Sequence, residues 1–336
     1  MRWPFSRHHW RTTSPAQCFP WTAACTTSPT STMAIIQPAT GMRSCLFVPA
    51  SSERLLASAR TAPADMIIID LEDSVIPQEK ETARQRAVDA ISSGGWSSPR
   101  LSVRVNAWES PWLLTDVTEL IRRCGANIDA IMLPKTRSAV DVICLDRILG
   151  QLECEGSLVP GGIRIDALIE DAAGFAQLDS IASAGERLRC LCFGAVDHRA
   201  SMGFRAGAAG DLQQSARLAI VSAARANDKL AVDGPFTQVR DAEAFRMDVM
   251  RCAGEGFDGR LLLHPAQIEI AHNEFAPTAE ETTLATRIGS ALDHSASTGS
   301  GVAVLDGVMV DEATQKWAQR IIARIEPTTR VNGEAP

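Results

Sequence analysis

Eight short apolar runs, separated by segments with helical character, most limit how this 336-residue chain can fold. Each run is rich in Ile, Leu and Val and has the length of a buried parallel strand. The runs cover residues 45–48, 66–71, 101–105, 128–133, 163–169, 188–193, 230–232 and 257–263. Because eight strands that alternate with helices are typical of a closed barrel, we predict an α/β fold of the TIM-barrel type, (β/α)8.

The segments between the runs carry the signals of helix boundaries. Pro77 opens a predicted helix over 77–91, and Gly150 is expected to stop a helix over 138–149. A doubly wound open sheet is the rival architecture. No glycine-rich phosphate loop follows the first run, however, which removes the main support for a nucleotide-binding open sheet.

The barrel is predicted to cover residues 41–275, with an appendage on each side. Residues 1–40 contain three Arg, no acidic residue and no continuous apolar stretch, so a secretory signal is not indicated. This leader is either an organellar transit peptide or a disordered segment that precedes a true start at Met33, and we favour the second interpretation. We accordingly expect a cytoplasmic protein, or a mitochondrial one if the leader is a transit peptide.

Residues 276–336 are predicted to form a C-terminal helical extension. Helices are expected over 280–292 and 311–325, with a short strand-like run at 302–305 between them. Asp311 stands at the N-cap position of the second helix. A barrel does not need such a tail, so we interpret it as a lid or an interface.

Charge and cysteine content exclude several classes of protein. The net charge is −7, and the leader contributes only basic residues, so the rest of the chain is acidic and a nucleic-acid partner is not expected. The nine Cys include no CxxC pair, which indicates neither a zinc site nor a disulfide framework. No apolar run approaches the roughly 18 residues that a membrane span requires.

Two carboxylates follow neighbouring runs. Glu170 comes directly after the run at 163–169, and Asp197 comes shortly after the run at 188–193. The carboxyl ends of parallel strands meet at one rim, so the two acids are candidates for a shared Mg²⁺, which prefers hard oxygen ligands. The alternative is that each acid only caps the helix that follows it.

Basic residues end two other runs. Arg104 closes an apolar run, where a permanent charge needs a carboxylate partner from either a substrate or the protein. The protein partner would be Glu72 or Asp73. Lys135 could contact a ligand or form a salt bridge with Asp70 or Glu72, and the sequence does not decide between these roles.

Nine motifs occur in the order seen in one family. They are RSCLFVPA (43–50), DMIIIDLEDSVIPQEKETAR (65–84), RVN (104–106), MLPK (132–135), ALIEDAAG (167–174), CFGAVD (192–197), DGP (233–235), GFDGRLLLHPAQI (256–268) and LDGVMVDEA (305–313). With this set the chain resembles the citrate lyase β-subunit-like proteins of the HpcH/HpaI aldolase family, which include malyl-CoA and citramalyl-CoA lyases. No single motif is specific, but the combination is.

The resemblance implies a barrel that binds Mg²⁺ and cleaves or forms a carbon–carbon bond between a CoA thioester and a 2-oxo acid. It implies that Glu170 and Asp197 hold the metal. It also implies that Arg43, Arg104 and Glu170 bind substrate. A homo-oligomer, trimeric or hexameric, is expected with it.

The resemblance gives a role to the tail as well. Asp311 matches an acid that reaches a neighbouring subunit's site and acts there as the acid/base, so the catalytic residues would be Arg104 and Asp311. An N-cap role for Asp311 needs no such explanation and stays open. Glu72, Asp73 and Lys135 are expected to lie just behind the metal ligands and tune them.

This chain departs from the family pattern next to the second metal ligand. Val196 stands where relatives commonly have an acid, and HRASMG follows Asp197 in place of an acidic-apolar run. These changes leave the substrate open. Two alternative functions remain, namely the β subunit of a citrate lyase acting on an acyl-carrier-protein thioester and a non-catalytic acyl-CoA-binding relative.

Overall fold

The computed structural model describes residues 42–205, 211–297 and 299–324. The predicted leader, residues 1–40, lies outside this part of the chain, as do residues 325–336. Among the described residues, no helix has the length and apolar character needed to cross a membrane.

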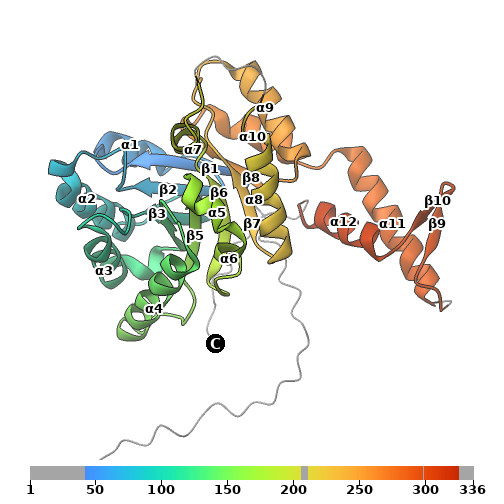
Figure 1. The fold of residues 1–336 in the computed structure, drawn as a ribbon, viewed down its shortest axis with the longest axis horizontal. Coiled ribbons are helices and arrows are strands. Elements are labelled where there is room, and N and C mark those ends of the chain that lie inside the picture. Colours follow the sequence, from blue (N-terminus) through green and yellow to red (C-terminus); the bar gives the residue numbers. More distant parts are fainter. Residues whose placement is uncertain (1–41, 206–210, 298, 325–336) are drawn as a thin grey trace, which may run out of the picture. The chain divides into compact units, whose positions relative to one another are not determined.

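Eight parallel strands close into a barrel in the order of the sequence (Figure 1). The ring is completed by pairing of the first strand with the last, where Cys45 lies opposite Leu261. The strands are β1 (Ser44–Pro49), β2 (Met66–Asp70), β3 (Arg100–Arg104), β4 (Ala130–Leu133), β5 (Arg164–Ile169), β6 (Leu188–Phe193), β7 (Leu230–Asp233) and β8 (Gly259–Leu262). The predicted (β/α)8 fold is therefore confirmed, and the open-sheet alternative is excluded.

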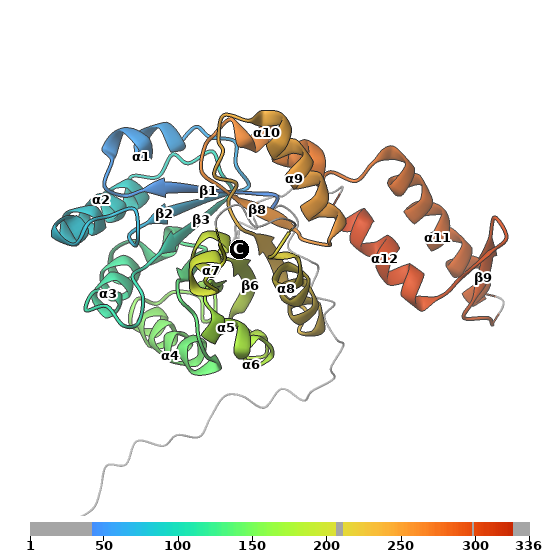
Figure 2. The ribbon, with the colours of Figure 1, turned by 45° about the horizontal axis from the view of Figure 1, so that its top comes forward.

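Helices surround the ring of strands (Figure 2). They are α1 (Glu53–Ala59), α2 (Lys80–Ser92), α3 (Leu113–Cys124), α4 (Ala139–Glu155), α5 (Ala172–Ala176), α6 (Leu178–Ala182), α7 (Ala195–Ser201), α8 (Gln214–Ala226), α9 (Ala242–Gly254) and α10 (Gln267–Phe275). Short 3₁₀ turns precede α2 and follow α3, at Pro77–Glu79 and Gly125–Asn127.

The prediction that Gly150 stops a helix is wrong. Helix α4 runs through this glycine to Glu155 and ends at the C-cap Gly156. Leu149 and Leu152 are buried on either side of Gly150, and their packing outweighs the roughly 1 kcal/mol that glycine costs inside a helix.

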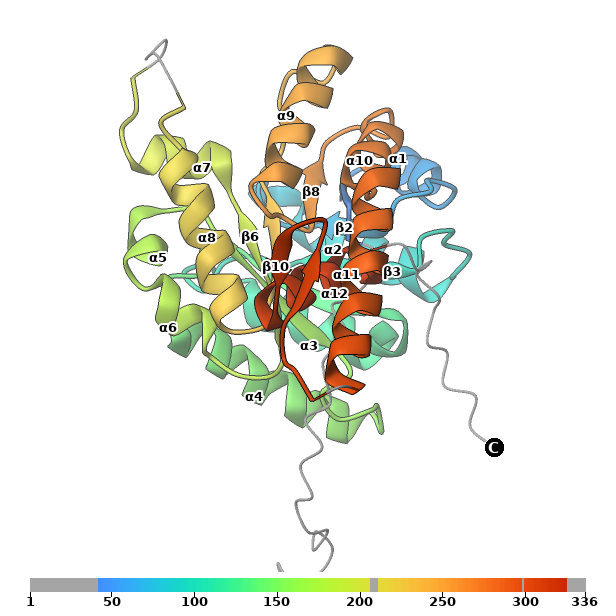
Figure 3. The same cartoon turned by 90° about the vertical axis from the view of Figure 1, so that its right-hand side faces the viewer.

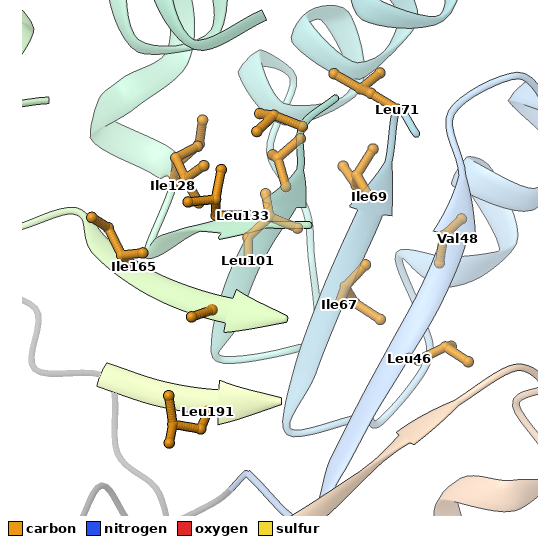
Figure 4. Close-up of a cluster of buried hydrophobic side chains, with 14 of the residues drawn as sticks. Leu46, Val48, Ile67, Ile69, Leu71, Leu101, Ile128, Leu133, Ile165 and Leu191 are labelled. Carbon is orange, nitrogen blue, oxygen red and sulfur yellow. The ribbon is translucent and has the colours of Figure 1, made fainter. Parts of the chain in front are cut away.

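Side chains alternate along each strand and build two separate cores. Leu46 and Val48 of β1, with Ile67 and Ile69 of β2, belong to the layer between strands and helices (Figure 4). The intervening residues fill the inside of the barrel, where the buried cluster consists of Met42, Cys45, Met66, Ile68, Met132, Leu168, Cys190, Cys192, Leu230, Val232 and Leu261. The inner residues nearest the carboxyl ends of the strands therefore form the floor of any site at that end of the barrel.

An ion pair lies inside the barrel toward the amino ends of the strands. The guanidinium of Arg189 donates to both carboxylate oxygens of Asp166, at 2.9 and 2.6 Å. A register shift between Ile165 and Asp166 interrupts the β5–β6 ladder beside this pair. Both side chains are almost fully removed from solvent, so the pair fills this part of the interior.

The chain continues beyond the barrel as α11 (Ala279–Ser297), β9 (Ala303–Leu305), β10 (Val308–Val310) and α12 (Glu312–Ala323) (Figure 3). Strands β9 and β10 form an antiparallel hairpin. Its turn residues, Asp306 and Gly307, both have positive φ, at 52° and 81°, as a two-residue hairpin turn requires.

This extension has a hydrophobic cluster of its own, made by Ala285, Ile288, Leu292, Val310, Ala318 and Ile321. The two predicted helices and the strand before the turn are present. The hairpin partner β10 was not predicted, because three residues carry too little pattern to indicate a strand. The extension is therefore a helix–hairpin–helix unit and not purely helical.

Candidate active site

A cavity of about 420 Å³ opens at the carboxyl ends of the barrel strands. One side of its wall carries acidic and basic side chains from residues at or after the ends of β2, β3, β5 and β6. The other side is apolar. The lining residues are Phe47, Pro49, Asp70, Asp73, Ser74, Arg104, Leu168, Glu170, Gly194, Ala195, Val196, Asp197, Pro235, Leu261 and Leu263. The cavity therefore lies where (β/α)8 barrels carry their active sites.

Glu170 follows β5 directly and is 1% exposed. Its Oε1 accepts a hydrogen bond from the backbone N–H of Lys135 at 2.7 Å. Its Oε2 is buried and has no hydrogen-bond partner among the described residues. A buried carboxylate oxygen without a donor is costly, so this atom is free to bind a ligand that the cavity admits.

Lys135 supports the site with both its backbone and its side chain. Its φ of 49° is unusual for a non-glycine residue and turns the chain after β4 so that its N–H meets Glu170. Its Nζ donates to Glu72 Oε1 at 2.5 Å and lies 3.5 Å from Asp73 Oδ1. The salt-bridge alternative with Glu72 is thus the one that the structure contains.

Asp197 lies in the first turn of α7, and its carboxylate makes no hydrogen bond or ion pair with any residue in the described part of the chain. The turn that leads to it passes against Glu170. A Cβ at Gly194 would lie 2.2 Å from Glu170 Cβ, so only glycine fits there. The close approach brings the two acids to one side of the cavity, as the sequence predicted.

The electrostatic surroundings of Glu170 favour binding of a cation. Burial, together with the negative charges of Glu72 and Asp197, raises its pKa to about 8. A divalent cation between Glu170 and Asp197 would remove this repulsion and fill the missing contact of Oε2.

The donor set fits Mg²⁺ in particular. Two carboxylates are hard oxygen ligands, and this ion usually keeps several waters or takes oxygens from its substrate. Among the described residues, no group of three or more His, Cys, Asp and Glu could hold a metal. The remaining ligands would therefore have to be water and substrate.

Arg104 ends β3 and lines the cavity. Its Nε and Nη2 donate to the two oxygens of Asp70 at 2.6 and 2.7 Å, and its Nη1 lies 3.1 Å from Glu72 Oε2. The guanidinium also lies over the ring of Phe47, at 4.8 Å. These acids, Asp70 above all, hold the pKa of Arg104 above its usual range despite burial.

Sequence reasoning named Asp70 only as a partner for Lys135, and it missed Gly194 and Lys80. Asp70 lies opposite Arg104 in the β2–β3 register, and this pairing identifies it as the partner of Arg104. Lys80 is 6% exposed and donates from Nζ to the carbonyl oxygens of Leu71 and Glu72, each at 2.8 Å. A lysine that is buried on an otherwise ordinary helix gives no signal in one sequence.

Arg43, which was predicted to bind substrate, does not line the cavity. Arg43 precedes β1 and thus lies at the amino end of the barrel, opposite to the cavity. Its guanidinium forms two hydrogen bonds with Asp65, each at 2.9 Å. Arg43 therefore has a structural role in tying the starts of β1 and β2 together.

Asp311 does not line the cavity and belongs to the extension. Its Oδ1 accepts hydrogen bonds from the backbone N–H groups of Ala313 and Thr314, at 3.0 and 3.1 Å, which completes a capping box. These bonds lower the pKa of Asp311. The N-cap role is present, and a role in a neighbouring subunit's site stays a prediction.

Residues 43–265 match the HpcH/HpaI aldolase/citrate lyase family. The chain belongs to this family. Its relatives in the HpcH/HpaI family include an L-malyl-CoA/beta-methylmalyl-CoA lyase of Cereibacter sphaeroides, 35% identical over 307 residues that cover 86% of this chain and 96% of the relative. Another is the citrate lyase subunit beta of Escherichia coli K12, 33% identical over 284 residues that cover 84% of this chain and 93% of the relative.

Solved structures of the family agree. The CitE protein of Mycobacterium tuberculosis, in complex with magnesium, acetoacetate and coenzyme A, has 30% identity and a TM-score of 0.66, covering 87% of this chain and all of that one (100%). A citrate lyase of Burkholderia xenovorans, 23% identical with a TM-score of 0.74 and covering 84% of this chain and 91% of that one, shares the fold. The predictions of the family and of a carbon–carbon lyase are therefore confirmed.

Proposed function

We propose that the protein is a Mg²⁺-dependent lyase of the malyl-CoA/citramalyl-CoA lyase type. It would cleave a 3-hydroxyacyl-CoA thioester to acetyl- or acyl-CoA and a 2-oxo acid, or form the thioester from these two. The observation that carries the proposal is the unpartnered, buried Oε2 of Glu170 beside Asp197 on the family's barrel cavity. Similarity to a lyase named for malyl-CoA and beta-methylmalyl-CoA supports the substrate class.

Glu170 and Asp197 would hold the Mg²⁺. When bound, the ion supplies Lewis-acid chemistry, acidifying the substrate hydroxyl and orienting the carboxylate of the nascent 2-oxo acid. Because Glu170 Oε1 is already fixed by the N–H of Lys135, its Oε2 stays directed to the ligand without reorganisation.

Arg104 would stabilise the negative charge that develops on the thioester oxygen as the carbon–carbon bond breaks. Asp70 and Phe47 fix the orientation of the guanidinium, so that a planar group of permanent charge faces the cavity. Phe47 and Leu168 line the same cavity, where their apolar side chains would keep water from the reacting carbon.

Asp311 would be the acid/base that protonates the enolate carbon, or removes its proton in the condensation. We propose that it acts in the cavity of a neighbouring subunit of a trimer or hexamer, with the extension as the lid. The lowered pKa of Asp311 favours its ionised form, which suits a base in the condensation. In cleavage the same carboxylate would first take up the proton that the substrate hydroxyl loses and then pass a proton to the enolate carbon.

A panel of malyl-, methylmalyl-, citramalyl- and citryl-thioesters, each assayed with Mg²⁺ and with EDTA, tests the proposal. Turnover of at least one CoA thioester is expected with Mg²⁺ and not with EDTA. Glu170→Gln should abolish that turnover, while Glu280→Gln, an exposed acid of the extension, should not. Turnover that EDTA leaves intact would overturn the metal-dependent mechanism.

A second candidate is the β subunit of a citrate lyase complex, whose thioester sits on an acyl carrier protein. The match to the citrate lyase subunit beta of E. coli favours it. Co-purification with a carrier protein, and turnover of citryl-carrier in place of any CoA thioester, would support this candidate. A non-catalytic acyl-CoA-binding relative would bind CoA thioesters and turn over none of the panel.

A cytoplasmic location belongs to the same proposal. Seven cysteines in the described part of the chain are all free, as in a reducing compartment.

A further inference from the structure

The ring of His198, the residue after Asp197, packs among three phenylalanines and does not line the cavity. Its centroid lies 4.5 Å from that of Phe175, 5.3 Å from Phe193 and 5.9 Å from Phe204. His198 is only 3% exposed. Because Phe175 lies on α5, the helix that follows Glu170, this one ring joins the helices behind the two carboxylates.

Gln213, the residue before α8, adds a polar link to the same place. Its Nε2 donates to the carbonyl oxygen of Ala195 at 2.7 Å and lies 3.1 Å from His198 Nδ1. An amide nitrogen can only donate, so His198 Nδ1 must present its lone pair and the ring hydrogen must be on Nε2. Gln213 therefore holds both the start of α7 and the imidazole.

Helix α7 needs such an anchor. It spans seven residues, Ala195–Ser201, and a helix of this length is marginal without tertiary contacts. Asp197 lies in its first turn, so any movement of this helix relative to β5 changes the separation of the Asp197 and Glu170 carboxyl groups. A further bond, from the N–H of Ala172 to Ser201 Oγ at 3.0 Å, ties the far end of α7 to α5.

We infer that Gln213 and His198 are positioning residues, which fix the separation of the Asp197 and Glu170 carboxylates before a cation binds. Neither side chain lines the cavity, so they would act only through α7. The inference rests on the proposed Mg²⁺ site and adds to it the part of the chain that holds the two carboxyl groups at a fixed separation. It also gives a function to the HRASMG segment, in which this chain departs from the family pattern.

Calorimetric titration of Mg²⁺ into the metal-free, full-length protein tests the inference. Gln213→Met keeps the size of the side chain and removes both donors, and we expect it to weaken the Mg²⁺ affinity about tenfold. His198→Phe keeps the aromatic packing, removes the Nδ1 acceptor and should act in the same direction. The matched control is Gln214→Ala, an exposed neighbour that should leave the affinity unchanged.

The melting temperature of the metal-free variants separates positioning from general destabilisation, and all three should melt close to the parent. In the double variant Gln213→Met/His198→Phe, the loss of affinity should not exceed that of Gln213→Met alone, because the bond that His198→Phe breaks is one of the two that Gln213→Met already removes. Losses that multiply would contradict the linked action of the two residues. If Gln213→Met does not fold, the Mg²⁺ affinity of His198→Phe alone tests the inference.

Glu170→Gln distinguishes failure of this inference from failure of the proposed function. If the parent protein binds no Mg²⁺, or binds it as well after Glu170→Gln, the metal site and the inference both fall. If the parent binds and Glu170→Gln does not, but Gln213→Met and His198→Phe bind as tightly as Gln214→Ala, only the inference falls.

Discussion

A single added carbon atom at Gly194 would disturb the site. We predict that Gly194→Ala lowers Mg²⁺ affinity and activity strongly, because the new Cβ would overlap Glu170 Cβ and push α7 or β5 away. Overpacking of this kind costs roughly 1–3 kcal/mol of stability. Gly289→Ala in α11 is the matched control, since no atom lies within 4 Å of its Cβ position and a helical alanine is favourable.

Enzyme assays and calorimetric Mg²⁺ titration of both variants give the comparison. Full Mg²⁺ affinity in Gly194→Ala would mean that the approach of Gly194 to Glu170 does not set the metal site.

The raised pKa of Glu170, about 8, predicts a pH-dependent Mg²⁺ affinity. Below pH 8 the carboxyl is mostly protonated, and a cation must displace that proton; above pH 8 it is ionised. The affinity should therefore rise about tenfold per pH unit between pH 6 and 8 and level off above. Calorimetry at pH 7 in two buffers of different ionisation enthalpy should detect release of close to one proton.

The stability of the metal-free protein should change in the opposite direction. The folded pKa of Glu170 exceeds the ordinary value of 4.5, so the folded state binds more protons than the unfolded state between these two values. Its contribution to stability is present below pH 4.5 and is lost as the pH rises toward 8. An affinity for Mg²⁺ that does not vary between pH 6 and 8 would contradict the raised pKa of Glu170, on which the predicted changes in affinity and in stability both depend.

The sequence predicted the residues that line the cavity better than the residues that hold them in place. Glu170, Asp197 and Arg104 were placed there because each lies at or shortly after the end of a strand-like run. Asp70 was not assigned to Arg104, because their contact depends on the β2–β3 register, which one sequence does not encode in any local pattern. Arg43 lies before β1 and pairs with Asp65, which was not predicted, because a motif at a strand does not by itself say at which end of the strand a residue lies.

At the scale of elements, the C-terminal extension is expected to be an independently opening unit. Its cluster is separate from the barrel cores, and Ile288 is 4% exposed within it. We predict that Ile288→Ala costs the extension about 2–5 kcal/mol. Hydrogen exchange should accelerate in α11, α12 and the hairpin, while the barrel strands keep their protection.

Leu284→Ala in the same helix is the control, because Leu284 is 41% exposed and its truncation should leave exchange unchanged. Acceleration of exchange in the barrel strands as well would mean that the extension and the barrel unfold together.

Sequence patterns predicted some of the helices and strands well and others poorly. The eight strands were predictable because buried parallel strands are continuous apolar runs. The end of α4 was not, since packing of Leu149 and Leu152 carries the helix past Gly150. The strand β10 was not predicted because it has only three residues, although the Asp306–Gly307 pair before it is a signal for a hairpin turn.

At the scale of the whole molecule, an active site shared between subunits can be tested by mixing two inactive variants. Arg104→Lys loses the planar fork and should reduce turnover about 100-fold. Asp311→Asn removes the proposed acid/base. Random co-assembly leaves about one quarter of the sites with both wild-type groups, so co-expressed variants should recover about that fraction of the parental activity.

Separately purified variants, mixed without reassembly, are the control and should stay inactive. If co-expression restores no activity although mass spectrometry finds mixed oligomers, Asp311 does not serve a neighbouring cavity.

The closure of the barrel between β1 and β8 has a consequence for biosynthesis. A Cβ at Gly259 would lie 1.7 Å from the carbonyl oxygen of Met42, so the two ends of the sheet meet backbone against backbone. Phe47 of β1 and Leu261 of β8 both line the cavity, and most of the sequence lies between these two residues. A nascent chain on the ribosome can therefore assemble neither the floor nor the wall of this cavity until residue 261 has emerged, and a prematurely terminated product should be a client of chaperones and proteases rather than a weaker catalyst.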